Sequence, residues 1–415
     1  TCWRERPSIH RSRNRLICRR RLIPPFYHIR IQQTNMSVSR SGESLSFTTA
    51  SSSSHSTTLL DRIRALDKSS ELASQYTPLI IFHPSLSGIS NDNDSSSYVV
   101  VGHAHTTLIE STLLHCTNDE GQPIFVMNRL KNRLGVMTDV LQLYMDVQMQ
   151  KKDGCSYNPA ENFHKCTAAF DHVTDHLLSS GITTRKHSDI YPIYPFTEMS
   201  NIDKQGDDSQ PNEKTVLAHV NRSTAPYLGI DSVGVHLNCY VCHDNGESSS
   251  EASIKGVWLA KRAPTKLHFP NVWDTTVAGG QPANLSLFDN IIKEAHEEAG
   301  VPEEWIRKPS HASGTFFSDH THDPLTITTA KDDGTCMKRS IYYSFDLKVP
   351  HSWTPTPVDG EVSEFRLYSM QELEEELRFG ESVRPSMRAV LLDFMIRHNA
   401  LRGADNVNDF RDAMR

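Results

Sequence analysis

The pattern of apolar and polar residues predicts a sheet and helices in the second half of the chain. Apolar residues alternate with other residues from 233 to 241, which is the period-two pattern of a β-strand. A polar loop at 244–253 separates this strand from a second strand at 256–260. We expect a further strand at 342–347 and a helix near 384–397. Strands and helices in this mixture indicate an α/β fold.

The first half of the chain shows shorter and less regular signals. Apolar residues at helical spacing begin at Leu59, prolines bracket a short buried strand at 78–84, and another strand starts at Tyr98. Residues 136–149 and 168–178 each have the spacing of an amphipathic helix. This mixture predicts a smaller α+β region.

The polar segment 201–214, NIDKQGDDSQPNEK, is the best candidate for a domain boundary. A chain of 415 residues, at about 150 residues per domain, is long enough for two or three domains. We therefore expect a smaller domain at 59–200, a linker at 201–214, a larger domain at 215–402 and a tail at 403–415.

Charge is distributed unevenly along the chain. The first 40 residues contain ten Arg and one acidic residue and carry +9, whereas the rest carries −16. The Arg-rich and Ser-rich composition of residues 1–58 is typical of an organelle transit peptide, which predicts a mitochondrial or plastid location. The other interpretation is an upstream extension before a true start at Met36, which predicts a cytoplasmic protein. Both interpretations place the segment outside the fold.

Composition excludes several classes of protein. The acidic body argues against a nucleic-acid-binding surface, and no apolar run approaches the ~18 residues of a membrane span. Eight Cys are too few for a disulfide framework in a chain of this length. Cys239 and Cys242 have the spacing of metal ligands, but no second pair completes the set, so we expect two half-buried thiols. Oligomeric state does not follow from any of these patterns.

Residues 274–301, DTTVAGGQPANLSLFDNIIKEAHEEAGV, combine a strand, a glycine pair and a helix with clear ends. Gly279 and Gly280 predict a tight backbone turn that a side chain would block. Ser286 has the residue type of an N-cap, and Gly300 is expected to end the helix.

The polar face of this helix carries three acidic residues. Glu294, Glu297 and Glu298 stand at i, i+3 and i+4, so their carboxylates lie on one face. Like charges at this spacing cost about 0.2–0.5 kcal/mol per pair in an exposed helix. A hard divalent cation such as Mg²⁺ takes oxygen ligands and would offset the repulsion. The helix therefore predicts a metal site.

The same segment resembles the Nudix box, the 23-position motif of the Nudix hydrolases. Leu285 stands where the family has its first Glu, and Lys293 stands where the family has Arg. In the family these two positions mainly brace the loop against the helix. The positions that match the motif are Gly279, Glu294, Ala295, Glu297, Glu298, Gly300 and Val301.

The resemblance extends beyond the box to the Nudix module in front of fungal thiamine pyrophosphokinases and to related plant organellar Nudix hydrolases. It implies a Nudix α/β/α sandwich with a mixed sheet, and the region from about Leu59 resembles the accessory domain that precedes it. Only 114 residues follow Val301, so no kinase domain and no pyrophosphokinase activity are expected. The segments that carry this wider resemblance are 219–238, 258–266, 358–365 and 393–398.

The resemblance implies hydrolysis of a diphosphate attached to an organic group, with Mg²⁺ or Mn²⁺ as cofactor. It favours thiamine diphosphate, or damaged analogues such as oxo- and oxythiamine diphosphate, cleaved to the monophosphate and phosphate. Two alternatives stay open. One is a nucleoside diphosphate phosphatase acting on, for example, 8-oxo-dGDP, and the other is a Nudix module that binds a diphosphate without turnover.

Site residues also follow from the resemblance. Glu294, Glu297 and Glu298 are the expected metal ligands. The general base is drawn from Glu298, from Glu297, or from Glu361 on a downstream loop.

The expected substrate contacts lie before and within the box. Arg262 and Lys266 are candidate phosphate contacts, because guanidinium and ammonium groups complement diphosphate oxygens. The backbone of Gly279 and Gly280 lies nearby. The aromatic residues that could stack on a substrate ring are Tyr227, Trp258, Phe269 and Trp273.

Overall fold

The computed structural model describes most of the chain after residue 57. The predicted linker at 201–214, and all but the last residue of the predicted leader, lie outside the described residues. The chain divides into compact units between residues 55 and 56, and everything described belongs to the second unit. The described ranges are 58–68, 72–82, 89–91, 94–131, 137–144, 158–195, 216–243, 253–310, 314–330, 335–402 and 407–414.

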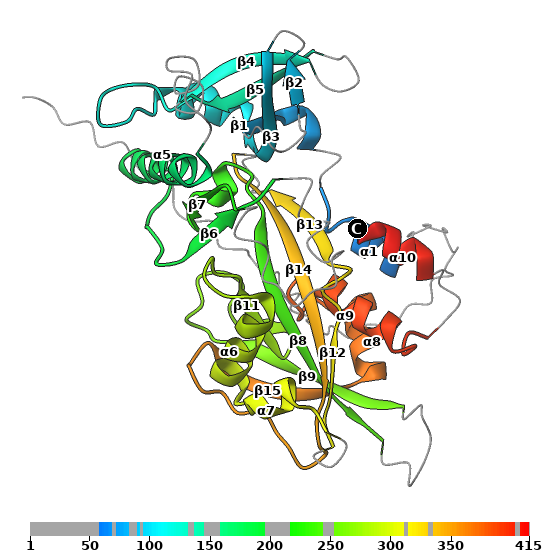
Figure 1. The fold of residues 1–415 in the computed structure, drawn as a ribbon. Helices are drawn as coiled ribbons and strands as arrows, with labels where there is room; N and C mark the ends of the chain where they lie inside the picture. The colour runs from blue at the N-terminus through cyan, green and yellow to red at the C-terminus, as the bar shows by residue number, and fades with distance from the viewer. Residues whose placement is uncertain are drawn as a thin grey trace, which may run out of the picture. The chain divides into compact units, whose positions relative to one another are not determined.

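A small sheet occupies the first part of the described chain (Figure 1). Within the described ranges it has five strands in the order β2-β3-β1-β5-β4, and all pairs are antiparallel except β1 with β5. The short helix α3 (Thr106–Ser111) follows β3. The strands are β1 (Tyr76–Phe82), β2 (Ile89–Asn91), β3 (Asp94–His105), β4 (Phe125–Lys131) and β5 (Met137–Leu143).

The predicted helix at 136–149 is wrong, because its described part forms β5. Val140, Leu141 and Leu143 are each 0% exposed, and the strand pairs with β4 on one side and β1 on the other. The first three residues of β5 are exposed or half-buried and the last four, including Gln142, are buried, so the strand has no clear alternation. Such a short segment is not separated from a helix by periodicity alone.

Helix α5 (Pro159–Ser179) contains the predicted helix at 168–178 and begins nine residues earlier. Asn158 caps it, since its side chain accepts hydrogen bonds from the N–H groups of Ala160 and Glu161. The buried face of α5 packs against the hairpin of β6 (Ile190–Ile193) and β7 (Ala218–Asn221). This core also includes residues of the five-stranded sheet.

The second sheet holds the candidate site. In the part of the chain that the structure describes, it has eight strands along the path β10-β9-β8-β14-β12, with β11 on β8, β13 on β14 and β15 on β9. The central pair β8–β14 is parallel and the other pairs are antiparallel, so the sheet is mixed. The strands are β8 (Ser232–Cys242), β9 (Ile254–Arg262), β10 (Trp273–Asp274), β11 (Val277–Gly280), β12 (Phe316–Asp319), β13 (Leu325–Ala330), β14 (Met337–Lys348) and β15 (Val362–Ser369).

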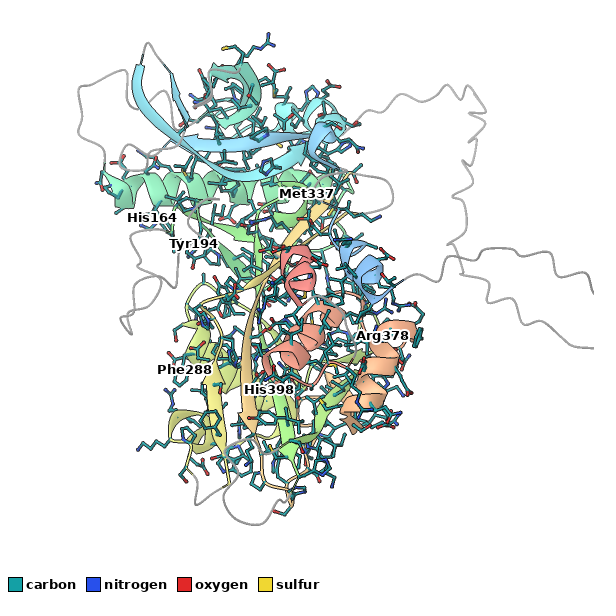
Figure 2. All side chains as sticks on the ribbon, turned by 90° about the vertical axis from the view of Figure 1, so that its right-hand side faces the viewer. His164, Tyr194, Phe288, Met337, Arg378 and His398 are labelled. Carbon is teal, nitrogen blue, oxygen red and sulfur yellow. The ribbon has the colours of Figure 1, made fainter. Side chains whose placement is uncertain are left out.

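Helices cover both faces of this sheet (Figure 1). Alternate residues of β8 and β14, such as Val235 and Phe345, pack with α6 (Leu287–Ala299), and α7 (Glu303–Arg307) joins the same side. The intervening residues, such as Tyr240 and Tyr342, pack with α8 (Met370–Phe379) and α9 (Met387–Arg397). Figure 2 shows Phe288 of α6 and His398, at the end of α9, on opposite sides of the sheet. The expected α/β/α sandwich with a mixed sheet is confirmed.

The two ends of the described chain pack together in the α8–α9 layer. Helix α1 (Leu59–Arg64) and helix α10 (Val407–Ala413) share that core, where Leu59 and Phe410 are at most 2% exposed. The sequence pattern predicts residues 59–64 as part of the first domain and 403–415 as a tail. Apolar spacing alone does not say which surface a short helix covers. No helix in the described ranges is both long and apolar enough to span a bilayer.

Candidate active site

The glycine pair of the box lies within a strand. Gly279 and Gly280 form the end of β11 and pair with Val235 and Gly234 of β8, so the predicted tight turn is wrong. A Cβ atom on Gly279 would lie 2.4 Å from Cγ of Glu294. Glycine is therefore needed for close approach of α6 to the strand.

The ends of α6 are as predicted. The hydroxyl oxygen of Ser286 accepts a hydrogen bond from the N–H of Asp289 at 3.0 Å, and the Asp289 carboxylate accepts one from that hydroxyl at 2.7 Å. Gly300 ends the helix with φ 66°, in the left-handed region. These two ends fix where the acidic face of α6 lies.

Amide side chains brace the loop between β11 and α6. The side-chain amide of Asn290 donates to the carbonyl of Gly280 and to the side-chain oxygen of Gln281, both at 3.0 Å. Gln281 in turn donates to the carbonyl of Leu285. Asn290 is 0% exposed. This network holds the loop in a chain that has Leu285 and Lys293 at the family's Glu and Arg positions.

Glu298 is the most enclosed acid of the site. It is 5% exposed, and its carboxylate accepts a hydrogen bond from the N–H of Ala278 at 2.9 Å. Burial raises its pKa well above the ordinary value, and the negative charges of Glu294, Asp274 and Glu361 add to the effect. Among the described residues, no Lys, Arg or His forms an ion pair with it.

The side chains of the other two acids of α6, Glu294 and Glu297, differ in exposure. The Glu294 side chain is 17% exposed and burial raises its pKa, whereas the Glu297 side chain is 46% exposed. Lys293 Nζ lies 3.3 Å from Glu294 and 2.7 Å from Glu297. Lys293 thus offsets the charge of both acids, and it lies closer to Glu297. Glu294 and Glu298 are the two less exposed acids of the helix.

A second source of acids comes from the turn before β15. Carboxylate oxygens of Glu298, Asp359 and Glu361 all lie within 4.8 Å of one another. Asp359 accepts a hydrogen bond from the N–H of Glu361 at 2.8 Å, and Gly360 between them has φ 83°. The structure therefore brings the predicted Glu361 to Glu298. Asp359 was missed, although the Asp-Gly pair beside Glu361 is a turn signal that could have found it.

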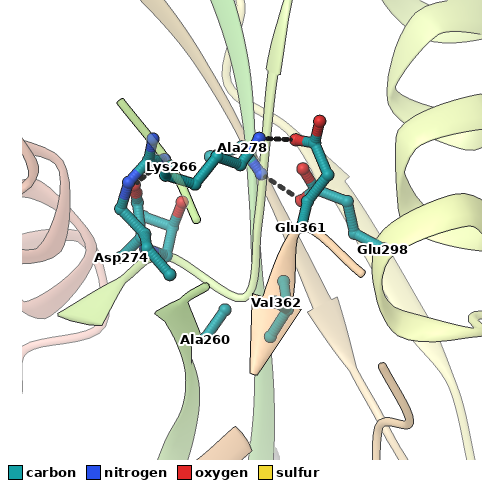
Figure 3. Close-up of a pocket in the computed structure, with 9 residues that line it drawn as sticks. Ala260, Lys266, Asp274, Ala278, Glu298, Glu361 and Val362 are labelled. Carbon is teal, nitrogen blue, oxygen red and sulfur yellow. Dashed lines mark hydrogen bonds and ion pairs between the residues drawn. The ribbon is translucent and has the colours of Figure 1, made fainter. Parts of the chain in front are cut away.

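A pocket joins Glu298 and Glu361 to basic residues (Figure 3). Lys266 Nζ forms an ion pair with Glu361, and Arg262 Nη1 lies 3.3 Å from Asp274. Both predicted phosphate contacts therefore reach the pocket, each beside an acid. The lining residues are Ala260, Arg262, Lys266, Asp274, Thr275, Ala278, Glu298, Glu361 and Val362.

Asp274 anchors two arginines at the edge of the pocket. Arg384 Nη1 lies 3.1 Å from the same Asp274 oxygen that pairs with Arg262. Burial raises the pKa of Asp274, but the charges of Arg384, His236 and Arg262 outweigh burial and hold it below the ordinary value. Sequence reasoning missed Asp274 and Arg384, because they meet only through the bridge between Trp273 and Val383.

Lys338 adds a positive charge close to these arginines. It lies on β14 and is partly buried. Burial lowers its pKa to about 8, and the charges of Arg384, Arg222 and Arg262 act in the same direction. Within the described ranges no acid pairs with Lys338. The edge of the pocket is therefore electropositive, whereas the floor at Glu298 is electronegative.

The four aromatic candidates separate by exposure. Tyr227 and Trp273 are each 8% exposed, and Trp258 packs against the α6 side of the core. Phe269 is 49% exposed. Of the four, Phe269 has a ring face available to a ligand.

Comparisons with known proteins agree with this geometry. Residues 238–390 match the family model described as NUDIX domain. Nudix hydrolase 24, chloroplastic, of Arabidopsis thaliana is 27% identical over 236 residues, which cover 57% of this chain and 55% of that protein. An uncharacterized protein of Saccharomyces cerevisiae is 29% identical over 189 residues, or 46% of this chain and 53% of that protein. The chain spans about half the length of the curated relatives it matches.

Solved structures also match. A Nudix hydrolase from M. smegmatis is 15% identical with a TM-score of 0.28, covering 42% of this chain and 89% of that one. The C. elegans Ap4A hydrolase complex is 13% identical with a TM-score of 0.27, covering 40% and 97%. Residues 238–390 of this chain thus match the NUDIX domain, and the chain is similar to the plant Nudix hydrolases over part of its length.

Proposed function

We propose that this chain hydrolyses a diphosphate linked to an organic group, in a reaction that depends on Mg²⁺ or Mn²⁺. The Nudix family acts on diphosphate-linked compounds, which gives the reaction class. The observation that carries the proposal is that Glu298 and Glu361 line one pocket with Arg262 and Lys266, while an Asp359 oxygen lies within 4.8 Å of both acids. This hydrolysis needs acidic side chains that bind a metal and basic side chains that bind phosphate oxygens.

The residues present fit a hard divalent cation. All the inward donors are carboxylate oxygens, and Glu298 is buried with its charge poorly compensated. Glu294, Glu298 and Asp359 would hold the cation, which when bound would neutralise phosphate charge and lower the pKa of water. Glu297 faces Lys293 and is proposed as an outer contributor.

The remaining groups position substrate and water. Arg262 and Lys266 would bind diphosphate oxygens, with Lys266 exchanging its pairing to Glu361 for a phosphate oxygen. Glu361, whose side chain is 52% exposed at the pocket, would then be free to accept a proton from the attacking water. Glu298, held by the N–H of Ala278, is the competing base.

Thiamine diphosphate or its oxo and oxy analogues are the proposed substrates, cleaved to the monophosphate and phosphate. Support comes from the resemblance to fungal and plant proteins and from the exposed ring of Phe269, whose carbonyl accepts a hydrogen bond from the pocket residue Arg262. A nucleoside diphosphate such as 8-oxo-dGDP is the alternative substrate.

A panel of diphosphates tests the proposal. Full-length protein with Mg²⁺ would be given oxythiamine diphosphate, thiamine diphosphate, ADP and 8-oxo-dGDP, and phosphate release would be measured. We expect the fastest release from oxythiamine diphosphate. Faster phosphate release from 8-oxo-dGDP would mean that the organic group of the substrate is a nucleoside and not thiamine. Binding without hydrolysis of any of the four would leave a non-catalytic Nudix module.

An organelle location is the proposal for the first 58 residues. It rests on the Arg-rich composition and on the two Arabidopsis relatives, whose names describe them as chloroplastic. A fluorescent protein fused after residue 58 should enter an organelle, and a uniformly cytoplasmic signal would favour the upstream-extension interpretation.

A further inference from the structure

The loop at residues 263–271, between β9 and β10, is fixed by Arg262. The Nε of Arg262 donates to the carbonyl of Phe269 at 3.1 Å, and Nη2 donates to the carbonyl of His268 at 3.2 Å. The N–H of Asn271 donates to the carbonyl of Arg262 at 3.1 Å. These bonds set the path of the loop without using its apolar side chains.

The backbone of this loop is strained at two positions. Phe269 has φ 52° and Asn271 has φ 60°, both in the left-handed region. Asn is tolerated there, but a bulky side chain such as Phe is unusual. Strain of this kind concentrates at ligand-binding sites, where the surrounding structure imposes it.

The imposed conformation leaves apolar groups in solvent. Leu267 is 67% exposed and Phe269 is 49% exposed. The guanidinium carbon of Arg384 lies 5.7 Å from the centre of the Phe269 ring, so a charge held by Asp274 supports the ring. Leu267 directly follows Lys266, which lines the pocket. Leu267 is thus next in the chain to one pocket residue, and the Phe269 carbonyl is hydrogen-bonded to another, Arg262.

We propose that Leu267 and Phe269 form the binding surface for the organic group of the substrate, and that this group carries a flat aromatic ring. The inference rests on the proposed function, because the pocket beside the loop must receive the diphosphate. An aromatic ring can stack on Phe269 while its diphosphate reaches Lys266 and Arg262. The two residues set specificity and take no part in bond cleavage.

Binding of two non-hydrolysable probes tests this division. The probes are the methylenediphosphonate analogue of thiamine diphosphate and methylenediphosphonate itself, which lacks the ring. Their Kd values would be measured by calorimetry with full-length protein and Mg²⁺. We expect Phe269→Ala to weaken the thiamine analogue about 10-fold and to leave methylenediphosphonate unchanged. Leu267→Ala should act in the same direction, by about 3-fold.

Two further variants separate ring recognition from structural damage. Phe269→Tyr keeps the ring and should bind the thiamine analogue as wild type does. Phe379→Ala removes another exposed ring, 75% exposed at the end of α8 and absent from the pocket lining, and should change neither Kd. Equal weakening of both probes by Phe269→Ala would overturn the proposal, as would no weakening or no binding of either probe by wild type.

The same measurements distinguish this inference from the proposed function. If the Phe269 dependence holds but no diphosphate is hydrolysed, the ring-binding surface stands and the hydrolase proposal fails. If diphosphates are hydrolysed and Phe269→Ala leaves both Kd values unchanged, only the ring-binding surface fails.

Discussion

Asp346 on β14 and Glu298 on α6 are both buried carboxylates, and the charges around them are opposite in sign. Asp346, on β14, is 0% exposed and accepts hydrogen bonds from Asn238 at 2.9 Å and from His398 at 2.8 Å. Arg397 forms an ion pair with the same carboxylate. Burial raises the pKa of Asp346, but bonds to two histidines and the charge of Arg397 outweigh it, so the pKa lies below the ordinary value.

Glu298 has one backbone donor and three nearby negative charges, and its pKa is raised. The comparison separates a buried carboxylate with a structural role from one with a functional role. A buried carboxylate whose charge is fully compensated holds the fold together, and one left undercompensated costs stability until a cation arrives. Removing each charge should therefore have opposite consequences.

The largest effect is expected from Glu298→Gln. Loss of this carboxylate removes a proposed metal ligand, so kcat/KM with oxythiamine diphosphate should fall about 10²- to 10³-fold. Steady-state kinetics with Mg²⁺ would measure it. Glu304→Gln, an exposed acid on α7, is the matched control and should be neutral. Unchanged turnover in Glu298→Gln would remove Glu298 from the reaction.

The next largest effect is expected from Asp346→Asn. This change removes one of the two carboxylates that pair with Arg397 and leaves Asp393 as the other, so the free energy of unfolding should fall by about 1–3 kcal/mol. Urea unfolding followed by circular dichroism would measure it. A stable Asp346→Asn protein that has lost Mg²⁺-dependent turnover would reverse the roles given to the two acids.

The pH dependence of stability sharpens the contrast. Without metal, the raised pKa means that charged Glu298 costs stability at neutral pH, and the cost disappears as pH falls toward the ordinary value of 4.5. The melting temperature of Glu298→Gln should exceed that of wild type by a few degrees at pH 7.5 and equal it near pH 4.5, in EDTA. The deficit of Asp346→Asn should stay constant over that range, because Asp346 remains ionised.

The smallest effect concerns the strained Phe269. Phe269→Gly and Phe269→Ala lose the same ring, but only glycine adopts φ 52° without strain. Phe269→Gly should be more stable than Phe269→Ala by about 1 kcal/mol in chemical unfolding. Equal stabilities of the two variants would mean that the loop relaxes when the ring is removed. The charge of Glu298 would then be the main destabilising feature of the site.

Local signals predicted much of the fold. Alternation gave β8, and Ser286 and Gly300 marked the ends of α6, because capping and side-chain periodicity depend on nearby residues. The same reasoning failed at β5, whose first three residues are exposed or half-buried and whose last four are buried, so no alternation is left. It also failed at Gly279, whose requirement is set by Glu294 packing across from another element.

The candidate site was predictable where one element carries it. Glu294 and Glu298 follow from helical spacing, whereas Asp359 reaches Glu298 only through the turn before β15. The difference between Glu297 and the two less exposed acids appears only in the structure, where the Glu297 side chain is 46% exposed and that of Glu294 is 17% exposed. These relations arise from tertiary packing, which sequence periodicity does not encode.

The placement of α1 means that order along the chain and order in space are different. Asp67 accepts a hydrogen bond from the N–H of Thr328 at 2.8 Å, and Arg62 pairs with Glu381 at 3.0 Å. Residues 58–68 precede the five-stranded sheet in the chain, but they pack into the core formed by helices α8, α9 and α10. A fragment cut at residue 216 would lack Leu59 and Ile63 from its own core, each worth about 1.5–3 kcal/mol. The eight-stranded sheet and its helices therefore form one packed unit that is built from two separate segments of the chain.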